Sequence, residues 1–421
     1  MKLVPVLFRV SLAIASICCI ASCGNKSSNN EPVIEADSIP IDTALSERLA
    51  KFAQAPRVKG RFAFYVFDLK ANKPIFGYKE SDAMPSASCL KLLTGVAGLN
   101  LLGSNFQYTS SLYIRGSIGN DGMLHGDAGL VAGTDPTFDV TEIQQFAKSL
   151  RTQGIKRISG RIFVDLAITE PIKSEEHWFP WDLSFSRYGI LYKGETRVAK
   201  ALKSAMQAQG IATKDSQFVY SAMPRGGHRI AVHTSSLNPV LERMWKNSSN
   251  VFATSLLYTI GRHYMPQLPP AEAGLNYLRS FMRDSLSISD STQAIHDGCG
   301  LCIYNRLSPQ TLVAVLQFGY RHKVIYQALI EHLPIAGVSG TLAREMTHAC
   351  TRGKIRAKTG TLSNPYGIST LAGYCQAANG HLLAFAIMAS EMSVLDARVL
   401  QRKLGELMVK DNETKTIGKQ S

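Results

Sequence analysis

The pattern of hydrophobic and polar residues over positions 61–78 predicts a β-hairpin. Residues 61–69 (RFAFYVFDL) are rich in aromatic and apolar side chains, and residues 75–78 form a second, shorter run. Residues 71–74, which lie between them, contain Asn and Pro, and both favour a turn. The pattern therefore predicts two adjacent strands.

A nearly unbroken apolar segment follows at residues 90–102 (LKLLTGVAGLNLL). The segment is too long for most strands and contains no Pro, so it predicts a buried helix. Gly103 comes directly after it, where a glycine commonly ends a helix.

The composition changes over residues 112–232, which we interpret as an inserted smaller domain. Glycines recur there and short strands are favoured over helices. One helix is expected at 196–209, with Gly210 ending it. Residues 45–111 and 233–410 would then form one discontinuous main domain.

The last part of the chain predicts more helices and a second hairpin. The pattern is helical over 239–261, and a strand is expected at 354–358. Two further strands, 368–376 and 381–388, flank Asn379-Gly380, a dipeptide that strongly favours a hairpin turn.

A final helix is expected from Ser393, a good N-cap, to Met408, before a tail at 411–421. Its core-facing residues are expected to be Leu395, Val399, Leu400, Leu404 and Leu407. Together these elements predict a mixed α/β (α+β) fold, in which helices sandwich a sheet and a smaller domain is inserted.

The first residues are typical of a secretory signal. Lys2 and Arg9 give a positive start, residues 10–21 are apolar, and small residues precede Cys23. The four residues that end at Cys23 (IASC) resemble the lipobox of bacterial lipoproteins, in which the cysteine carries the lipid. A plain signal peptide is the alternative.

The lipoprotein interpretation predicts a signal peptide over 1–22, lipidation of Cys23 and a tether over 23–44. It places the protein in the bacterial cell envelope, on the periplasmic side and most simply at the outer membrane, with the lipid as its membrane contact.

The chain carries 46 Lys and Arg against 32 Asp and Glu, a formal net charge of +14. A basic surface attracts anionic partners. For a secreted chain, lipid headgroups or anionic wall polymer fit better than nucleic acid, which we do not expect as a partner. A solvated basic surface without a dedicated partner explains the charge equally well. The sequence gives no signal for an oligomeric state.

Ser88-Cys-Leu-Lys91 is the only Ser-x-x-Lys sequence in the chain. Residues three apart share a helix face, so the hydroxyl and the amine can meet. A serine needs an adjacent base to act as a nucleophile, and a lysine can serve if burial or a nearby cation lowers its pKa. Taken alone, the motif is equally consistent with a capping serine and a surface lysine.

Lys358-Thr359-Gly360 is the only Lys-Thr-Gly sequence, and it is expected at the end of the strand 354–358. Glycine permits close approach of a ligand to a strand, and the lysine and hydroxyl could hold a substrate carboxylate. The amide of Thr361 could contribute to an oxyanion hole. The alternative is a turn with an exposed lysine.

A Ser-x-Asn sequence occurs at two suitable places, residues 236–238 and 248–250. The first is followed by Pro239 and predicts a loop, whereas the second precedes an apolar helical run. Ser248 could relay a proton to a leaving group and Asn250 could hold a substrate amide, unless the segment is simply a helix cap.

In this order, Ser-x-x-Lys, Ser-x-Asn and Lys-Thr-Gly form the signature of penicillin-binding proteins and class A β-lactamases. The surrounding residues resemble, more narrowly, the D-Ala-D-Ala carboxypeptidase/endopeptidase family of low-molecular-weight penicillin-binding proteins, the S13 serine peptidases. The resemblance rests on residues 86–94, 126–137, 297–308, 337–344 and 358–361.

The resemblance implies a penicillin-binding-protein/β-lactamase-like fold and acyl transfer to Ser88, with Lys91 as the base. It implies that Ser248 and Asn250 are the second motif and that Lys358 and Thr359 bind the substrate carboxylate. Gly360 completes the third motif, and the amides of Ser88 and Thr361 would form the oxyanion hole. The implied partners are peptidoglycan stem peptides and inhibitory β-lactams, and no metal or cofactor is implied.

Three departures qualify the resemblance. The segment between Ser88 and Ser248 is shorter than in fuller family members, Ile303 stands where many relatives have Arg, and Cys299 and Cys302 replace two serines. Glycines around Cys299 favour a loop, so we expect neither a redox nor a metal centre there.

Two other functions stay open at this point. A β-lactamase would share the three motifs, but no segment after Asn250 resembles the loop that carries the hydrolytic Glu of class A enzymes. A wall-binding lipoprotein that has lost turnover is the second alternative, and the intact Ser88, Lys91 and Lys358 argue against it.

Overall fold

The computed structural model describes residues 39–55, 59–172, 178, 189–363 and 366–410. The predicted signal peptide, Cys23 and the C-terminal tail lie outside the described residues. Within these ranges, no helix combines the length and the apolar character needed to cross a membrane.

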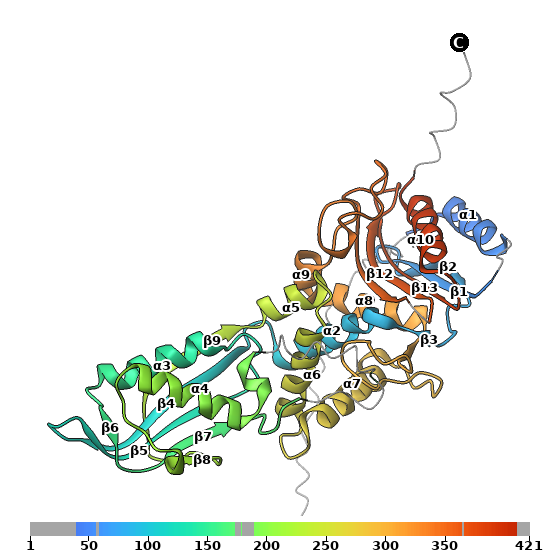
Figure 1. Cartoon of the computed structure of the whole chain (residues 1–421). Coiled ribbons are helices and arrows are strands. Elements are labelled where there is room, and N and C mark those ends of the chain that lie inside the picture. The colour runs from blue at the N-terminus through green and yellow to red at the C-terminus, as the bar shows by residue number, and fades with distance from the viewer. Residues whose placement is uncertain (1–38, 56–58, 173–177, 179–188, 364–365, 411–421) are drawn as a thin grey trace, which may run out of the picture. The chain divides into compact units, whose positions relative to one another are not determined.

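A five-stranded antiparallel sheet brings together strands from the N-terminal and C-terminal parts of the described chain. Both predicted hairpins are present and pair through the contact between β1 and β13 (Figure 1). In spatial order its strands are β11 (Ile355–Leu362), β12 (Ile368–Gln376), β13 (Leu382–Ser390), β1 (Arg61–Asp68) and β2 (Lys73–Tyr78). On its outer side, residues 355–357 of β11 bond to residues 334–336, and from Lys358 onward the strand has no strand partner there among the described residues.

Helices cover both faces of this sheet (Figure 1). One face carries α1 (Thr43–Gln54) and α10 (Val394–Val409), and the other carries α2 (Leu90–Leu102) and α8 (Pro309–Arg321). Four further helices belong to this part of the fold: α5 (Asn238–Trp245), α6 (Asn250–Tyr264), α7 (Pro270–Leu286) and α9 (Lys323–His332). A two-stranded sheet pairs β3 (Met84–Pro85) with β10 (Arg306–Leu307). The predicted fold class is confirmed.

A second sheet lies between α2 and α5 in the sequence. Its strands are β8 (Phe218–Val219), β7 (Ile162–Leu166), β5 (Met123–Ala132), β4 (Gln107–Ile118) and β9 (His228–Ser236), with β6 (Arg157–Ile158) paired to β5. Both β4 and β9 run past residues 112 and 232, the bounds expected from the sequence. Two helices pack on it, α3 (Val140–Thr152) and α4 (Glu195–Ala208). Of these only α4 was predicted, although a capping box of Asp139 and Glu142 marks the start of α3.

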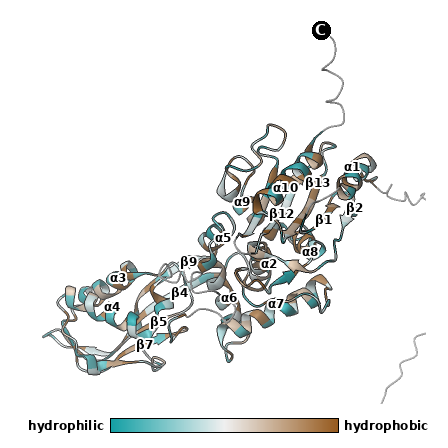
Figure 2. Cartoon of the chain, turned by 45° about the vertical axis from the view of Figure 1, so that its right-hand side comes forward, coloured by the Kyte–Doolittle hydropathy of each residue, from teal (hydrophilic) through white to brown (hydrophobic). Residues whose placement is uncertain are grey.

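The apolar segment 90–102 forms α2, and Gly103 follows it with φ 76°, as expected. The helix is buried nearly all round because it lies between the sheet with α8 on one side and α5 with α6 on the other. Figure 2 shows the hydrophobic colouring of the neighbouring strands β12 and β13. The indole Nε1 of Trp245 donates to the Lys91 carbonyl oxygen at 2.9 Å, which fixes α5 against the first turn of α2.

Two predictions near the motifs need correction. The strand expected at 354–358 continues to Leu362, because Thr359 to Leu362 pair with β12. Lys358-Thr359-Gly360 therefore lies within an edge strand and not at its end. The helical stretch 239–261 is two helices, separated by a break in which Ser248 has φ 58°.

The predicted core face of the last helix is partly wrong. Leu395 is 74% exposed and Val399 is 37% exposed, whereas Ala397 and Gln401 are buried. The amide Nε2 of Gln401 donates to Ser369 Oγ at 3.2 Å, so a polar contact holds the helix on the sheet. A pattern built on large apolar residues does not detect a face made of small and paired polar side chains.

The close contact between α2 and Trp245 gives a test of the packing. A Cβ atom added at Gly95 would lie 2.3 Å from Trp245 Cζ2, whereas one at Gly98 would meet Leu256 and Ile260 methyl groups at 3.2–3.3 Å. We expect Gly95→Ala to lower the free energy of unfolding by roughly 1–3 kcal/mol, measured by urea denaturation.

Gly98→Ala is the matched control on the same helix. It removes the same backbone freedom and should change stability by less than about 1 kcal/mol. Equal effects of the two substitutions would contradict the packing described.

Candidate active site

Ser88 lies in a 3-10 turn, Ala87–Cys89, that leads directly into α2. Ala87 has φ 42°, an uncommon conformation for a residue with a side chain. A Cβ added at Gly300 would lie 1.9 Å from the Ala87 carbonyl oxygen, and one at Gly360 would lie 2.9 Å from the Ser88 nitrogen. Because Gly300 and Gly360 have no Cβ atom, the backbones of two different elements pack directly against the turn and hold Ser88 in place.

Lys91 is fully buried beside Ser88. Its Nζ lies 2.8 Å from Ser88 Oγ and 2.8 Å from Asn250 Oδ1, and it also donates to the carbonyl oxygen of Cys299. A neutral amine has two N–H donors and one lone pair. With Asn250 and Cys299 as acceptors, the lone pair is left for the Ser88 hydroxyl, which is the arrangement a general base requires.

Burial lowers the pKa of Lys91 from its ordinary value of 10.5, because a charged ammonium loses its hydration. The Asp297 carboxylate acts in the opposite direction, as thiolates at Cys299 and Cys89 would, and does not cancel the desolvation. The neutral form of Lys91 is therefore more accessible near neutral pH than in an exposed lysine.

Lys358 is also fully buried, and burial with the nearby charge of Lys91 lowers its pKa to about 7. Its Nζ donates to Ser248 Oγ at 2.7 Å and to the Thr359 carbonyl oxygen at 2.6 Å. Ser248 is held in a left-handed conformation just before α6, and it is Ser249 that caps that helix. The two lysines are therefore each hydrogen-bonded to a different serine.

A cavity of about 370 Å³ opens over these groups. Ser88, Ser248, Thr359 and Thr361 line it, and the hydroxyl of Thr359 lies 2.7 Å from that of Thr341. Its other lining residues are Leu342, Glu345, Met346, Ser369, Thr370, Leu371, Arg398, Gln401 and Arg402. Nucleophile and hydroxyl groups thus face one space large enough for a small peptide.

A buried carboxylate holds the loop that binds Lys91. Asp297 accepts hydrogen bonds from the backbone N–H groups of Cys299, Gly300 and Cys302. It also accepts from Asn305 Nδ2 at 3.0 Å and from Trp178 Nε1 at 2.9 Å. These contacts orient the Cys299 carbonyl oxygen, which in turn binds Lys91, so Asp297 is a positioning residue.

Cys299 and Cys302 are buried free thiols on this loop. Burial raises the pKa of Cys299 well above its ordinary value, so its sulfur is a neutral thiol. Among the described residues, no cluster of three or more His, Cys, Asp or Glu side chains is placed to hold a metal ion.

The structure brings the residues of all three predicted motifs together: Ser88, Lys91, Ser248, Asn250, Lys358, Thr359, Gly360 and Thr361. The alternative Ser236 lies at the end of β9 and does not line the cavity. Asn250 contacts Lys91, a role that the sequence did not suggest. Sequence reasoning also missed the roles of Asp297, Thr341 and Trp178. The first two lie within the stretches that carry the family resemblance, but no pattern marked Trp178.

A nucleophilic serine with a buried lysine base, at the edge of a helix-covered antiparallel sheet, defines a serine acyl-transfer enzyme of the penicillin-recognising class. The model of the D-Ala-D-Ala carboxypeptidase 3 (S13) family matches residues 45–188 and 191–410, so the chain belongs to that family.

Two curated relatives show the extent of the similarity. The D-alanyl-D-alanine carboxypeptidase DacB of Haemophilus influenzae is 23% identical over 406 residues, which cover 76% of this chain and 84% of the relative. A D-alanyl-D-alanine carboxypeptidase of an Actinomadura species is also 23% identical, over 82% of this chain and 81% of its own length.

Solved structures show the same fold. Penicillin-binding protein 4 (dacB) from Haemophilus influenzae superimposes with a TM-score of 0.73 at 21% identity, covering 86% of this chain and 99% of that protein. The same protein in complex with a β-lactam gives a TM-score of 0.69 at 22% identity, covering 86% of this chain and all of that one.

The burial of Lys91 predicts how acylation depends on pH. Because the pKa of Lys91 is lowered from 10.5, its neutral fraction should rise with pH until Lys91 has lost its proton, and with it the rate of Ser88 acylation at a saturating β-lactam concentration. Lys91→Arg should slow acylation by a β-lactam about 10²–10⁴-fold, since Arg keeps its proton. Stopped-flow measurement of adduct formation across pH 5–10 is the test.

Lys79→Arg, an exchange at a lysine outside the cavity, is the control and should keep the wild-type profile. A Lys91→Arg variant that acylates at the normal rate would show that another group is the base.

Proposed function

We propose that this protein is a serine-type D-Ala-D-Ala carboxypeptidase/endopeptidase that acts on peptidoglycan stem peptides through an acyl-enzyme on Ser88. The observation that carries the proposal is the contact of the Ser88 hydroxyl with the buried Lys91 amine in a cavity that Thr359 also lines. Membership of the S13 family and the carboxypeptidase relatives support the same substrate class.

Acylation begins when the neutral Lys91 takes the Ser88 proton. Ser88 Oγ then attacks the carbonyl carbon of the penultimate D-Ala, and a negatively charged oxygen develops. The amides of Ser88 and Thr361 are proposed to stabilise it. The contact between Gly360 and the Ser88 backbone supports this, because it brings β11 beside the start of α2.

The leaving amine needs a proton. Ser248 Oγ accepts from Lys358 Nζ and lines the cavity, so it can pass a proton to the departing nitrogen while Lys358 replaces it. The terminal D-Ala, or the amino group of a cross-linked peptide, then leaves. Before deacylation, Lys91 loses the Ser88 proton and Lys358 regains one, by exchange with solvent. Water then attacks the acyl-enzyme, the neutral Lys91 takes a proton from it, and that proton passes to Ser88 Oγ as the acyl bond breaks.

Recognition of the substrate carboxylate is proposed for Thr359 and Lys358. The Thr359 hydroxyl is oriented by that of Thr341, and the side chains of Thr341 and Thr359 line the cavity. A β-lactam carries a carboxylate at the corresponding place, which explains how such drugs would acylate Ser88. The β-lactam complex of the Haemophilus protein supports this use of the fold.

The activity is tested with a synthetic stem pentapeptide that ends in D-Ala-D-Ala. Wild-type protein should release one D-Ala per peptide, and Ser88→Ala should lose at least about 10³-fold of this activity because the acyl-enzyme cannot form. Ser104→Ala, an exposed serine in the turn after α2, is the control and should be fully active.

Nitrocefin hydrolysis measured on the same samples separates this function from the alternatives. Fast nitrocefin turnover without D-Ala release would identify a β-lactamase. A stable penicillin adduct without D-Ala release would identify a binding protein that has lost turnover.

We further propose that Cys23 carries a lipid and anchors the protein on the periplasmic side of the bacterial cell envelope, at the outer membrane. The support is the sequence IASC at residues 20–23, after a positively charged and apolar start. Two or more acyl chains would hold the protein stably, whereas one alone gives only marginal binding.

The anchor is tested by fractionation of cells that express Cys23→Ser. The variant should leave the membrane fraction, or accumulate with its signal uncut, whereas wild type should stay with the outer membrane. Cys375→Ser, at a buried cysteine of β12, controls for the loss of a thiol and should fractionate as wild type. Wild type found entirely in the soluble periplasm would rule out the anchor.

A further inference from the structure

The cavity over Ser88 continues past Thr359 to α10, where no motif predicts a function. Arg398, Gln401 and Arg402 line this end of it. Residues at positions i, i+3 and i+4 share one face of a helix, so the two guanidinium groups are neighbours there. The space therefore joins the reacting serine to a pair of cations on the far side of β11.

The positive charge at this end is only partly balanced. Glu345 accepts from Arg398 Nη1 at 3.1 Å and from Arg402 Nη1 at 3.4 Å, and it is the one acidic residue that lines the cavity within the described chain. Two guanidinium groups against one carboxylate leave a surplus positive charge. Among the described residues, neither guanidinium has another hydrogen-bond acceptor, so Nε and Nη2 of each are available.

The exposure of these groups suits a binding site that opens to solvent. The side chains of Arg398 and Arg402 are 37% and 44% exposed, and that of Glu345 is 26% exposed. Glu345 holds the two cations side by side, which offsets the repulsion between like charges four residues apart on a helix. A guanidinium with open N–H groups matches the planar, two-oxygen geometry of a carboxylate.

We propose that Arg398 and Arg402 form a carboxylate-binding subsite for the leaving side of the substrate. The inference rests on the proposed function, in which the leaving residue binds at Thr359. Any part of the substrate that extends from Thr359 toward α10 belongs to the departing group. The subsite therefore selects substrates whose departing group is anionic.

A carboxylate can reach this subsite from two sources. It can be the α-carboxylate of the leaving residue, shared with Thr359, or a carboxylate further along a second peptide that a cross-link joins to the first. The first source favours carboxypeptidase substrates, and the second favours cross-linked substrates.

The test compares wild type with an Arg398→Gln, Arg402→Gln double variant on two substrates, a monomeric pentapeptide and a cross-linked dimer. Each substrate is used with its leaving-side carboxylates free and amidated. For the free form the double variant should raise KM about tenfold with little change in kcat, because a charge-assisted contact made in both the ground and the transition state is lost. The amidated form should not respond to the two substitutions.

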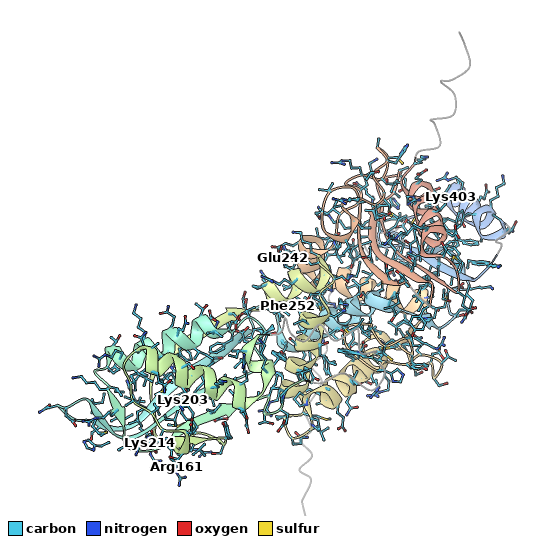
Figure 3. The ribbon with its side chains drawn as sticks, in the orientation of Figure 1. Arg161, Lys203, Lys214, Glu242, Phe252 and Lys403 are labelled. Atoms are coloured by element: carbon cyan, nitrogen blue, oxygen red, sulfur yellow. The ribbon has the colours of Figure 1, made fainter. Side chains whose placement is uncertain are left out.

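Lys403→Gln is the matched control. Lys403 is exposed on the same helix (Figure 3), does not line the cavity and carries the same charge, so this variant should behave as wild type. An effect on the pentapeptide identifies the leaving residue's own carboxylate as the ligand, and an effect on the dimer alone identifies the second peptide.

Equal KM values for wild type and the double variant on every substrate would overturn the proposal. So would an equal loss on free and amidated forms, because the effect would then not depend on the substrate's charge. The KM values for free and amidated substrate are compared within one enzyme preparation. A fraction of unfolded enzyme would affect both measurements equally, so it does not change their ratio. A wild-type protein that neither releases D-Ala nor cleaves the dimer would instead refute the proposed function.

Discussion

The site depends on one constraint, the burial of two lysine amines side by side. Lys91 and Lys358 have no solvent exposure, and this desolvation lowers the pKa of each amine. Removing an ammonium from water costs several kcal/mol unless it is fully paired or loses its proton. Two such groups in one site cannot both stay charged at low cost, so near neutral pH the pair favours having one neutral amine. Of the two, it is the neutral form of Lys91 that can take the Ser88 proton, because Lys91 is the amine in contact with Ser88 Oγ.

Much of the surrounding structure serves this constraint. Asn250 at the start of α6 and the Cys299 carbonyl give Lys91 its acceptors, and Asp297 fixes the loop that carries that carbonyl. Ser248 and the Thr359 carbonyl do the same for Lys358. Trp245 binds the Lys91 carbonyl, which keeps the first turn of α2 in register with α5. Several elements far apart in the sequence therefore converge on two nitrogen atoms.

The arrangement also carries backbone strain at both serines. Ala87, next to Ser88, and Ser248 have positive φ values of 42° and 58°. Each costs about 1–2 kcal/mol for a residue with a Cβ atom. Because these residues lie at the two hydroxyl groups, the strained backbone fixes the orientation of Ser88 and Ser248 at a cost in folding stability.

The sequence was sufficient to predict the residues of the chemistry but not all of their contacts. Short motifs, both hairpins and the buried helix 90–102 depend on local patterns, and these were predicted. The contact of Asn250 with Lys91 spans 159 positions and that of Trp178 with Asp297 spans 119, so no local spacing could reveal them. The buried face of α10 was mispredicted because Gln401 is buried through a hydrogen bond. The strand that contains Lys358 was predicted to end too early because its pairing with β12 is not local.

The central claim is that Lys91 gives up its proton far more readily than an exposed lysine. NMR of protein labelled with ¹³C at the lysine Cε carbons measures this directly, with the Lys91 signal identified by its absence from Lys91→Arg. The account predicts a Lys91 resonance that titrates below 10.5, accompanied by a second shifted lysine, Lys358, near pH 7. A Lys91 resonance that titrates at 10.5 or above would contradict the account.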